Sequence, residues 1–358
     1  MVKRLLLVIF SLLFLSACSP TQDVIIGGEP TRTLPPTWTP EPALEVSETV
    51  PPASPTTTST STVTPELDLT LAAHRQEVAE ATLGAFPTRL AGEPGKIAYE
   101  ASEVLESSAI FVMNPDGSDQ TLLVSGDNGV IVGSPAWSPD GKFLAYTCNN
   151  HLCVVNFDGS GYRQVTESTS NRYFPNWLPD GNLIAFGKIN KEIVFNVHTL
   201  DVASGSEELV LPGAYAASWS PDGTHIAFLK LNDDLQNEMY VRSIQGGNDV
   251  KIWDFEVETF AWSSDGEYLL LSAKEEKSTL EHEIYVIHPD GSGVVKLTEN
   301  DWDDIYPVWS PDSTQIAFSS KQFGNYDIFV MNVNGSNVQQ LTTSVLDETA
   351  PSWQPDQE

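Results

Sequence analysis

The chain has 358 residues, of which 49 are Asp or Glu and 18 are Lys or Arg, so its formal net charge at pH 7 is −31. A surface of this charge lacks the basic patch that binds phosphate backbones, which argues against nucleic acid as a partner and against flat adsorption on anionic lipid. The charge favours solubility, and it leaves divalent cation binding or a cationic partner as the more specific alternatives.

The first 17 residues have the composition of a secretory signal. Lys3 and Arg4 precede an apolar run from Leu5 to Leu15, which is too short to span a bilayer as a helix. The phrase Leu15-Ser16-Ala17-Cys18 resembles a bacterial lipobox. The resemblance implies cleavage before Cys18 and lipidation of that residue. It would anchor the protein to the extracytoplasmic face of the bacterial cell membrane, in the periplasm or at the cell surface; a plain secretory signal with a chance cysteine is the alternative.

Residues 18–65 are rich in Pro, Thr and Ser, and a short predicted helix follows them. The stretch Thr56–Thr62 has almost nothing apolar to bury, so we expect 18–65 to be a disordered tether, with O-glycosylation as an open possibility. Thr64-Pro65-Glu66 supplies a cap, a first-turn proline and an early acid, and Gly84 suits a helix end. We therefore expect a short helix and a connector over residues 66–92.

The rest of the chain, residues 93–358, is built on a phrase that returns six times. Its form at 135–141 is Pro-Ala-Trp-Ser-Pro-Asp-Gly, and its tryptophans stand 40 to 47 residues apart. These residues are Trp137, Trp177, Trp219, Trp262, Trp309 and Trp353. A period of this length indicates one supersecondary unit repeated, here a propeller blade. The identical place of each Trp in its unit predicts a wedge in the core between blades rather than a ligand platform.

Each unit contains short apolar runs separated by turn residues. After the first Trp come Leu144–Tyr146 and Leu152–Val154, and the unit ends in a weaker strand such as Leu297-Thr298 in a later copy. In Ser138-Pro139-Asp140-Gly141 the Pro fixes φ, the Asp bonds to the local backbone and the Gly accepts a positive φ. The pattern predicts four antiparallel strands joined by hairpins in every blade.

The two ends of the repeat region complement each other. Lys96–Tyr99, Ile110–Val112 and Leu122–Val124 look like second, third and fourth strands without a first, and Pro351–Trp353 looks like a first strand without followers. We therefore predict an all-β fold: a six-bladed β-propeller of four-stranded antiparallel blades, closed by both chain ends and preceded by a disordered tether and a short helix.

The Trp-Ser-Pro-Asp-Gly phrase, the Ile-Ala-Phe strand and the Asp-Gly turn resemble the TolB-type propeller repeat over about residues 95–358. WD40 repeats match less well, because their Trp-Asp and Gly-His pairs are missing. The resemblance implies a six-bladed propeller. TolB proteins also have a separate N-terminal α/β domain, and no such domain fits before residue 95, so partnerships specific to TolB do not carry over.

Two further cysteines, Cys148 and Cys153, flank a tight hairpin between predicted strands. Directly opposed residues in such a hairpin can meet disulfide geometry, and an extracytoplasmic compartment permits oxidation. We expect a disulfide, with two free half-buried thiols as the alternative.

Enzyme motifs are absent: the sequence contains no Gly-x-Ser-x-Gly, no His-Glu-x-x-His, no P-loop and no Rossmann glycine pattern. Six scattered histidines do not suggest a metal centre. We therefore predict no enzymatic activity, no cofactor and no metal ligands.

Binding is expected on the face that carries the loops between second and third strands and between blades, because non-repeating residues gather there. Exposed aromatic side chains beside carboxylates suit a peptide or a sugar, and ordinary solvated loop is the alternative. The candidate residues are Arg172, Tyr173, Tyr215, Asp301, Trp302, Asp303, Asp304 and Tyr306.

The sequence thus favours a membrane-tethered, non-enzymatic module that binds a protein or peptide of the cell envelope. A carbohydrate-binding or carbohydrate-active propeller is the alternative, and a mainly structural envelope protein is a third reading.

Overall fold

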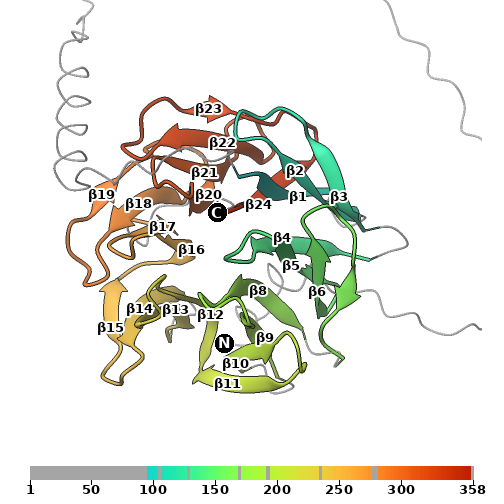
Figure 1. The fold of residues 1–358 in the computed structure, drawn as a ribbon. Helices are drawn as coiled ribbons and strands as arrows, with labels where there is room; N and C mark the ends of the chain where they lie inside the picture. The colour runs from blue at the N-terminus through green and yellow to red at the C-terminus, as the bar shows by residue number, and fades with distance from the viewer. Residues whose placement is uncertain are drawn as a thin grey trace, which may run out of the picture. The chain divides into compact units, whose positions relative to one another are not determined.

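The structure is a computed structural model that describes residues 95–355, apart from 104–106, 127–129, 168–170, 191–193, 234–235 and 276–280. The predicted signal at 1–17, the lipid site Cys18, the linker at 18–65 and the helix over 66–92 lie outside the described residues. Within them, twenty-four strands form six four-stranded antiparallel sheets arranged as blades around an axis (Figure 1). The predicted six-bladed propeller is therefore confirmed.

Five of the sheets each use four consecutive strands. The first contains β4 (Val132–Trp137), β5 (Phe143–Cys148), β6 (His151–Asn156) and β7 (Arg163–Gln164). The second contains β8 (Arg172–Trp177), β9 (Leu183–Ile189), β10 (Phe195–Asp201) and β11 (Glu207–Pro212). The third contains β12 (Ala214–Trp219), β13 (His225–Leu231), β14 (Asn237–Ser243) and β15 (Val250–Trp253). The fourth contains β16 (Val257–Trp262), β17 (Leu269–Ala273), β18 (Glu283–Ile287) and β19 (Val295–Lys296). The fifth contains β20 (Asp304–Trp309), β21 (Gln315–Ser320), β22 (Asp327–Asn332) and β23 (Gln339–Gln340).

The sixth sheet combines strands from both ends of the described chain. Strand β24 (Asp347–Trp353) pairs with β1 (Ile97–Glu103), which is followed by β2 (Ser107–Met113) and β3 (Thr121–Ser125). Ile97 lies opposite Trp353, and Gln354 exchanges two hydrogen bonds with the backbone of Lys96. In Figure 1 the red β24 lies beside the cyan β1. The sheet has the composition that the complementary fragments predicted.

The Ser-Pro-Asp-Gly turns close as their chemistry requires. In the first, Gly141 N–H donates to the Ser138 carbonyl at 2.8 Å, and Gly141 has a φ of 65°. The Asp140 carboxylate accepts bonds from the Ser138 hydroxyl and the Lys142 N–H at 2.6 and 3.1 Å. This arrangement joins the first and second strands of a blade, so all these turns lie on one face of the ring, which we call the turn face. The opposite side is the loop face.

The repeat tryptophans pack between neighbouring blades, as predicted. Trp177 is 7% exposed and shares an apolar cluster with Leu152 and Val154 of the preceding sheet. Its indole N–H donates to the Ala136 carbonyl of that sheet at 3.1 Å. Burying a side chain of this size contributes about 2–3 kcal/mol, so each Trp fastens one blade to the next.

The fourth strands begin earlier than predicted. The run Leu297-Thr298 was expected to form one, but β19 covers Val295–Lys296, and Leu297 N–H still bonds to the Ile284 carbonyl at 2.8 Å. The Thr298 hydroxyl then accepts the Ile284 N–H at 2.9 Å. A side chain thus replaces the backbone at that step of the ladder, which ends the strand.

Candidate functional site

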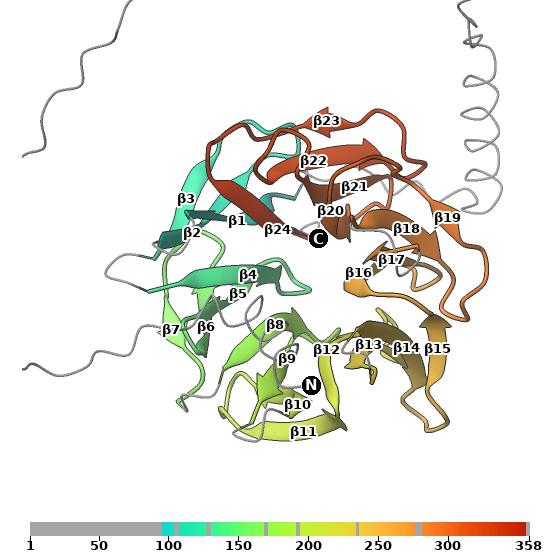
Figure 2. The ribbon, with the colours of Figure 1, turned by 180° about the vertical axis from the view of Figure 1, so that it is seen from behind.

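The first strand of each sheet lies closest to the axis, and six such strands surround a central channel: β4, β8, β12, β16, β20 and β24 (Figure 2). Two cavities occupy the channel, one opening at each face. They share five lining residues: Glu258 and four residues that stand three positions before a repeat Trp, namely Ser134, Phe174, Tyr306 and Ala350.

These four residues have left-handed backbone conformations. Their φ angles lie between 50° and 56°, and each falls at a break in the register between the first and second strands of its sheet. Positive φ is an outlier for Phe and Tyr, and such residues and β-bulges cluster at sites where a side chain must be aimed. The bulges turn the inner strands so that the preceding residue in each faces the loop-face cavity.

The loop-face cavity has a volume of about 520 Å³ and is strongly acidic. Four carboxylates line it, and the guanidinium of the one lining cation, Arg172, is paired with Glu207 at 2.6 Å. The carboxylates belong to Glu100, Glu256, Glu258 and Asp347.

Two of these carboxylates lie deep in the channel. Burial raises the pKa of Glu100 to about 7, although the Ser134 N–H donates to it at 3.1 Å. Burial also raises the pKa of Glu258, with the nearby Glu256 acting in the same direction. Glu258 has no hydrogen-bond or ion-pair partner among the described residues. A bound cation would therefore stabilise its buried carboxylate by supplying the missing ion-pair partner.

Four tyrosines share this cavity with the acids: Tyr173, Tyr215, Tyr306 and Tyr326. Burial, together with the charge of Glu258, raises the pKa of Tyr215 and of Tyr306, so both phenols stay protonated. The Tyr215 hydroxyl is buried and makes no hydrogen bond within the described part of the chain. Rings and carboxylates side by side suit an ammonium or guanidinium group.

The structure brings together four of the eight predicted binding residues: Arg172, Tyr173, Tyr215 and Tyr306 all line the loop-face cavity. Two of them are not exposed, contrary to expectation. The Arg172 side chain is wholly buried, because it pairs with Glu207 and donates to the Asn150 carbonyl at 3.1 Å. Tyr215 is 5% exposed, because it packs edge-on against Phe174 and Phe195.

The other four, Asp301, Trp302, Asp303 and Asp304, do not line either channel cavity. We expected an exposed Trp302 surrounded by free carboxylates, and the structure does not form this surface. Asp303 accepts bonds from His282 and Tyr326, which ties adjacent blades together. Asp304 is 1% exposed and accepts the Asn300 side-chain amide at 2.8 Å. Trp302 is half-buried, and Asp301 alone of the four is exposed.

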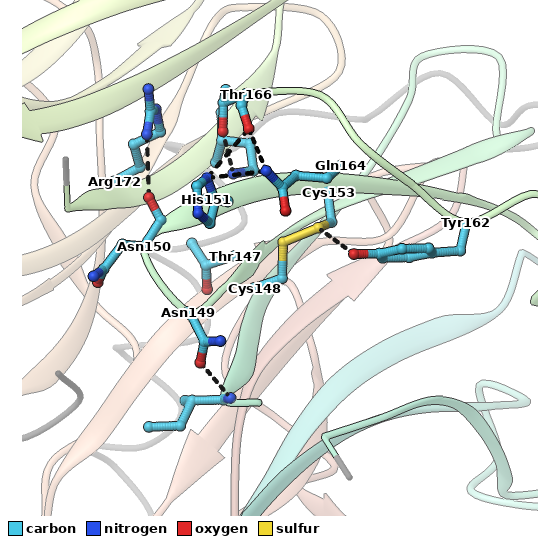
Figure 3. Close-up of a disulfide and its surroundings, with 12 residues drawn as sticks. Thr147, Cys148, Asn149, Asn150, His151, Cys153, Tyr162, Gln164, Thr166 and Arg172 are labelled. Carbon is cyan, nitrogen blue, oxygen red and sulfur yellow. Dashed lines mark hydrogen bonds between the residues drawn. A yellow bond between two sulfur atoms is a disulfide. The ribbon is translucent and has the colours of Figure 1, made fainter. Parts of the chain in front are cut away.

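The disulfide hairpin also borders the cavity. Cys148 and Cys153 are joined, and Figure 3 shows the bond beside the turn formed by Asn149 and Asn150. The two cysteines are diagonal rather than directly opposed, since Cys148 lies across from His151. Asn149 exchanges two bonds with Ile131, and Asn150 accepts from Arg172. The crosslink therefore braces a turn that contributes to the cavity wall.

Sequence reasoning missed Glu100, Glu256, Glu258 and Tyr326. A signal was available for Glu258: aligning the six copies on their Trp puts it four residues before, where the other copies have Gly133, Tyr173, Tyr215, Ile305 and Thr349. All six side chains or backbones at that position line the loop-face cavity. Glu100 is the only charged residue directly after a second-strand apolar run.

The described residues contain neither a cluster suited to a metal ion nor a helix suited to a membrane. No group of three or more His, Cys, Asp or Glu side chains among them is arranged to hold a metal ion. No helix in that part of the chain has the length and apolar character needed to cross a membrane.

Sequence relatives match short parts of this chain. A 65-residue segment is 42% identical to Dipeptidyl-peptidase 5 of Porphyromonas gingivalis, which covers 15% of this chain and 10% of that protein. A 64-residue segment is 38% identical to the Protein TolB homolog of Chlorobium luteolum, which covers 18% of this chain and 14% of that protein. The matches thus span small fractions of both relatives.

A solved structure and a family model resemble this propeller. The crystal structure of TolB from Acinetobacter baumannii superposes with a TM-score of 0.62 at 18% identity, covering 73% of this chain and 67% of that one. Residues 203–358 match the family model of the TolB beta propeller domain, PD40. Residues 203–358 therefore carry the TolB-type propeller repeat, and the ring as a whole has the fold of the TolB propeller.

Proposed function

We propose that this protein is a non-enzymatic binding module of the bacterial cell envelope, whose loop-face cavity receives a basic segment of a protein or peptide. A lipid on Cys18 would tether it to the extracytoplasmic face of the membrane, and residues 18–65 would act as the spacer. The observation that supports the binding role most strongly is the group of four carboxylates beside four tyrosines in a cavity of about 520 Å³.

The charge of the lining selects the partner. Arg172 is neutralised by Glu207, and Glu256 is the only lining carboxylate with a lysine partner, Lys274 at 2.8 Å. Lys or Arg side chains entering the cavity would pair with the remaining acids and stack on tyrosine rings, in surroundings where water screens the attraction less than at an open surface. Acidic segments would meet repulsion.

The similarity to a dipeptidyl peptidase does not carry peptidase activity to this chain, because the shared segment is 10% of that protein. A TolB-type propeller gives a rigid ring on which loops and inner strands present a binding site, and the same fold serves unrelated functions.

Three labelled probes test the proposal on the mature protein: the basic peptide Ser-Lys-Thr-Arg-Ser-Lys-Gly, its copy with Glu for each Lys and Arg, and a chitotetraose. Fluorescence anisotropy should show saturable binding of the basic peptide alone, weakened by salt, and mass spectrometry should recover the peptide intact. Preference for the glycan would favour the carbohydrate-binding alternative. Cleavage of the peptide would contradict a non-enzymatic role.

A further inference from the structure

The turn-face half of the channel is a second cavity of about 490 Å³ with a different chemistry from the first. Three repeat tryptophans contribute to its wall: Trp177, Trp219 and Trp262. Trp177 is almost buried, whereas Trp219 and Trp262 are half-buried, so part of the indole surface faces the cavity. These tryptophans therefore do more than pack between blades as predicted, because they also line a cavity.

Most polar groups of this wall are bonded to each other, and the exception is the carboxylate of Glu258, which also lines the loop-face cavity. The indole N–H of Trp262 donates to the Ser218 carbonyl at 3.1 Å, and the Ser218 hydroxyl donates to the Asn176 amide oxygen at 3.3 Å. The Ser352 hydroxyl accepts the backbone N–H of Trp137 at 3.2 Å. A glycan would find few free hydrogen-bonding groups here to replace the hydrogen bonds that its hydroxyls make with water. An apolar side chain makes no such bonds with water, so it can enter the cavity without losing any.

The rim of the cavity adds charge to this apolar interior. Pro139, Pro179 and Pro221 line it and are exposed, and each is followed by an exposed aspartate of the same turn. In the third of these turns, the hydroxyl of Ser220 and the N–H and hydroxyl of Thr224 hold the pKa of Asp222 at about 2. That carboxylate therefore stays ionised at every physiological pH.

We propose that the turn-face cavity is a second binding site, which takes an aromatic or proline side chain of a polypeptide whose flanking residues are basic. The apolar anchor would lie against Trp177, Trp219 and Trp262, and the flanking cations would face the rim aspartates. Charge complementarity selects this occupant, because an acidic segment or an anionic lipid surface would be repelled by the rim. The three tryptophans that hold the anchor do not line the loop-face cavity, although Glu258 and four other residues line both cavities.

The test uses the mature protein and the labelled peptide Lys-Lys-Pro-Trp-Pro-Lys-Lys. Replacing its Trp by Ala should weaken binding about tenfold, which corresponds to the burial of one large apolar side chain. Exchanging the four lysines for glutamates should abolish binding. Equal binding of the Trp and Ala peptides would overturn the proposal, since the attraction would then be charge alone.

Matched variants locate the site. Pro179→Lys adds a positive charge to the lining, whereas Pro311→Lys makes the same change at the same turn position in a blade whose proline does not line the cavity. The proposal predicts that binding is weakened at least about fivefold in Pro179→Lys, because the new cation repels the lysines of the peptide, and that it is unchanged in Pro311→Lys. It also predicts that Tyr173→Ala, which alters the loop-face cavity alone, leaves the difference in affinity between the Trp and Ala peptides unchanged. Binding lost in Tyr173→Ala and kept in Pro179→Lys would place the peptide in the other cavity and overturn the proposal, while leaving the loop-face function intact.

Discussion

Glu100 in β1 accepts a hydrogen bond of 3.1 Å from the backbone N–H of Ser134 in β4, so a carboxylate of the sixth sheet supports a left-handed residue of its neighbour. The same carboxylate faces the loop-face cavity. Its burial therefore couples the packing of two blades to the charge of the candidate binding site.

Stability should depend on pH through this residue. Folding raises the pKa of Glu100 from its ordinary value of 4.5 to about 7. The native state thus holds a proton that the unfolded state releases between these values, so this contribution is greatest below pH 4.5 and is lost as pH rises to about 7. Relative to Glu100→Gln, wild type should lose up to about 3 kcal/mol of unfolding free energy across this window. Guanidinium unfolding of both proteins at pH 5, 6, 7 and 8 measures this difference in unfolding free energy. If the two proteins show the same dependence on pH, the raised pKa of Glu100 is contradicted.

Residues inside and outside the loop-face cavity should respond differently to truncation. Tyr173→Ala removes a lining ring and should weaken binding of the basic peptide about tenfold, as for an interface anchor. Trp302→Ala, at a residue that lines neither cavity, should change binding less than about twofold. Anisotropy titrations of both variants provide the comparison. A larger loss of peptide binding in Trp302→Ala than in Tyr173→Ala would instead support the binding surface around Trp302 that the sequence suggested.

The pairing of β24 with β1 should be essential for stability. Ending the chain after Leu346 removes β24 and leaves the inner edge of β1 unpaired, so we expect a loss on the order of 5 kcal/mol or failure to fold cooperatively. Ending it after Pro355 keeps every described strand and serves as the control. Similar unfolding curves for the two truncations would show that β24 does not secure the ring.

The disulfide between Cys148 and Cys153 closes a short loop, so the double change to serine should lower the unfolding free energy by only about 1–3 kcal/mol. Because the bond braces Asn149 and Asn150 at the cavity wall, peptide binding should weaken as well. Alkylation mapping of the native protein should find both thiols protected, and labelling of both under non-reducing conditions would refute the bond.

Lipidation at Cys18 is tested by Cys18→Ala, which should move the protein from the membrane fraction to the soluble fraction or stall its processing. A variant that remains membrane-bound and normally processed would contradict the lipobox interpretation.

The blade architecture could be predicted because it repeats. Six copies of a Trp-x-x-Asp phrase, five of them with Pro before the Asp, place strand, turn and wedge in the same frame, and the missing first strand at one end matches the extra one at the other. The binding residues were harder to predict because they interrupt the repeat. Glu258 and Glu100 come from different strands of different blades, and only ring closure brings them into one cavity.

Burial explains the predictions that failed. Arg172 and Asp304 look like loop residues in the sequence, yet each stands five residues before a repeat Trp, at the start of an inner strand packed between blades. Inside the protein Arg172 forms an ion pair with Glu207, and Asp304 accepts a hydrogen bond from the Asn300 amide. Polarity alone does not distinguish a side chain that joins two blades from one that faces a partner.

The most direct test of the account is a titration of the basic peptide into the mature protein carrying Glu258→Gln, with Glu208→Gln as the matched control on the exposed outer strand β11. Both variants remove one carboxylate, so they change the net charge equally. The account predicts about tenfold weaker binding for Glu258→Gln, because a desolvated charge pair is lost, and unchanged binding for Glu208→Gln. Equal effects in the two variants would mean that the peptide responds to overall charge and that the loop-face cavity is not its site.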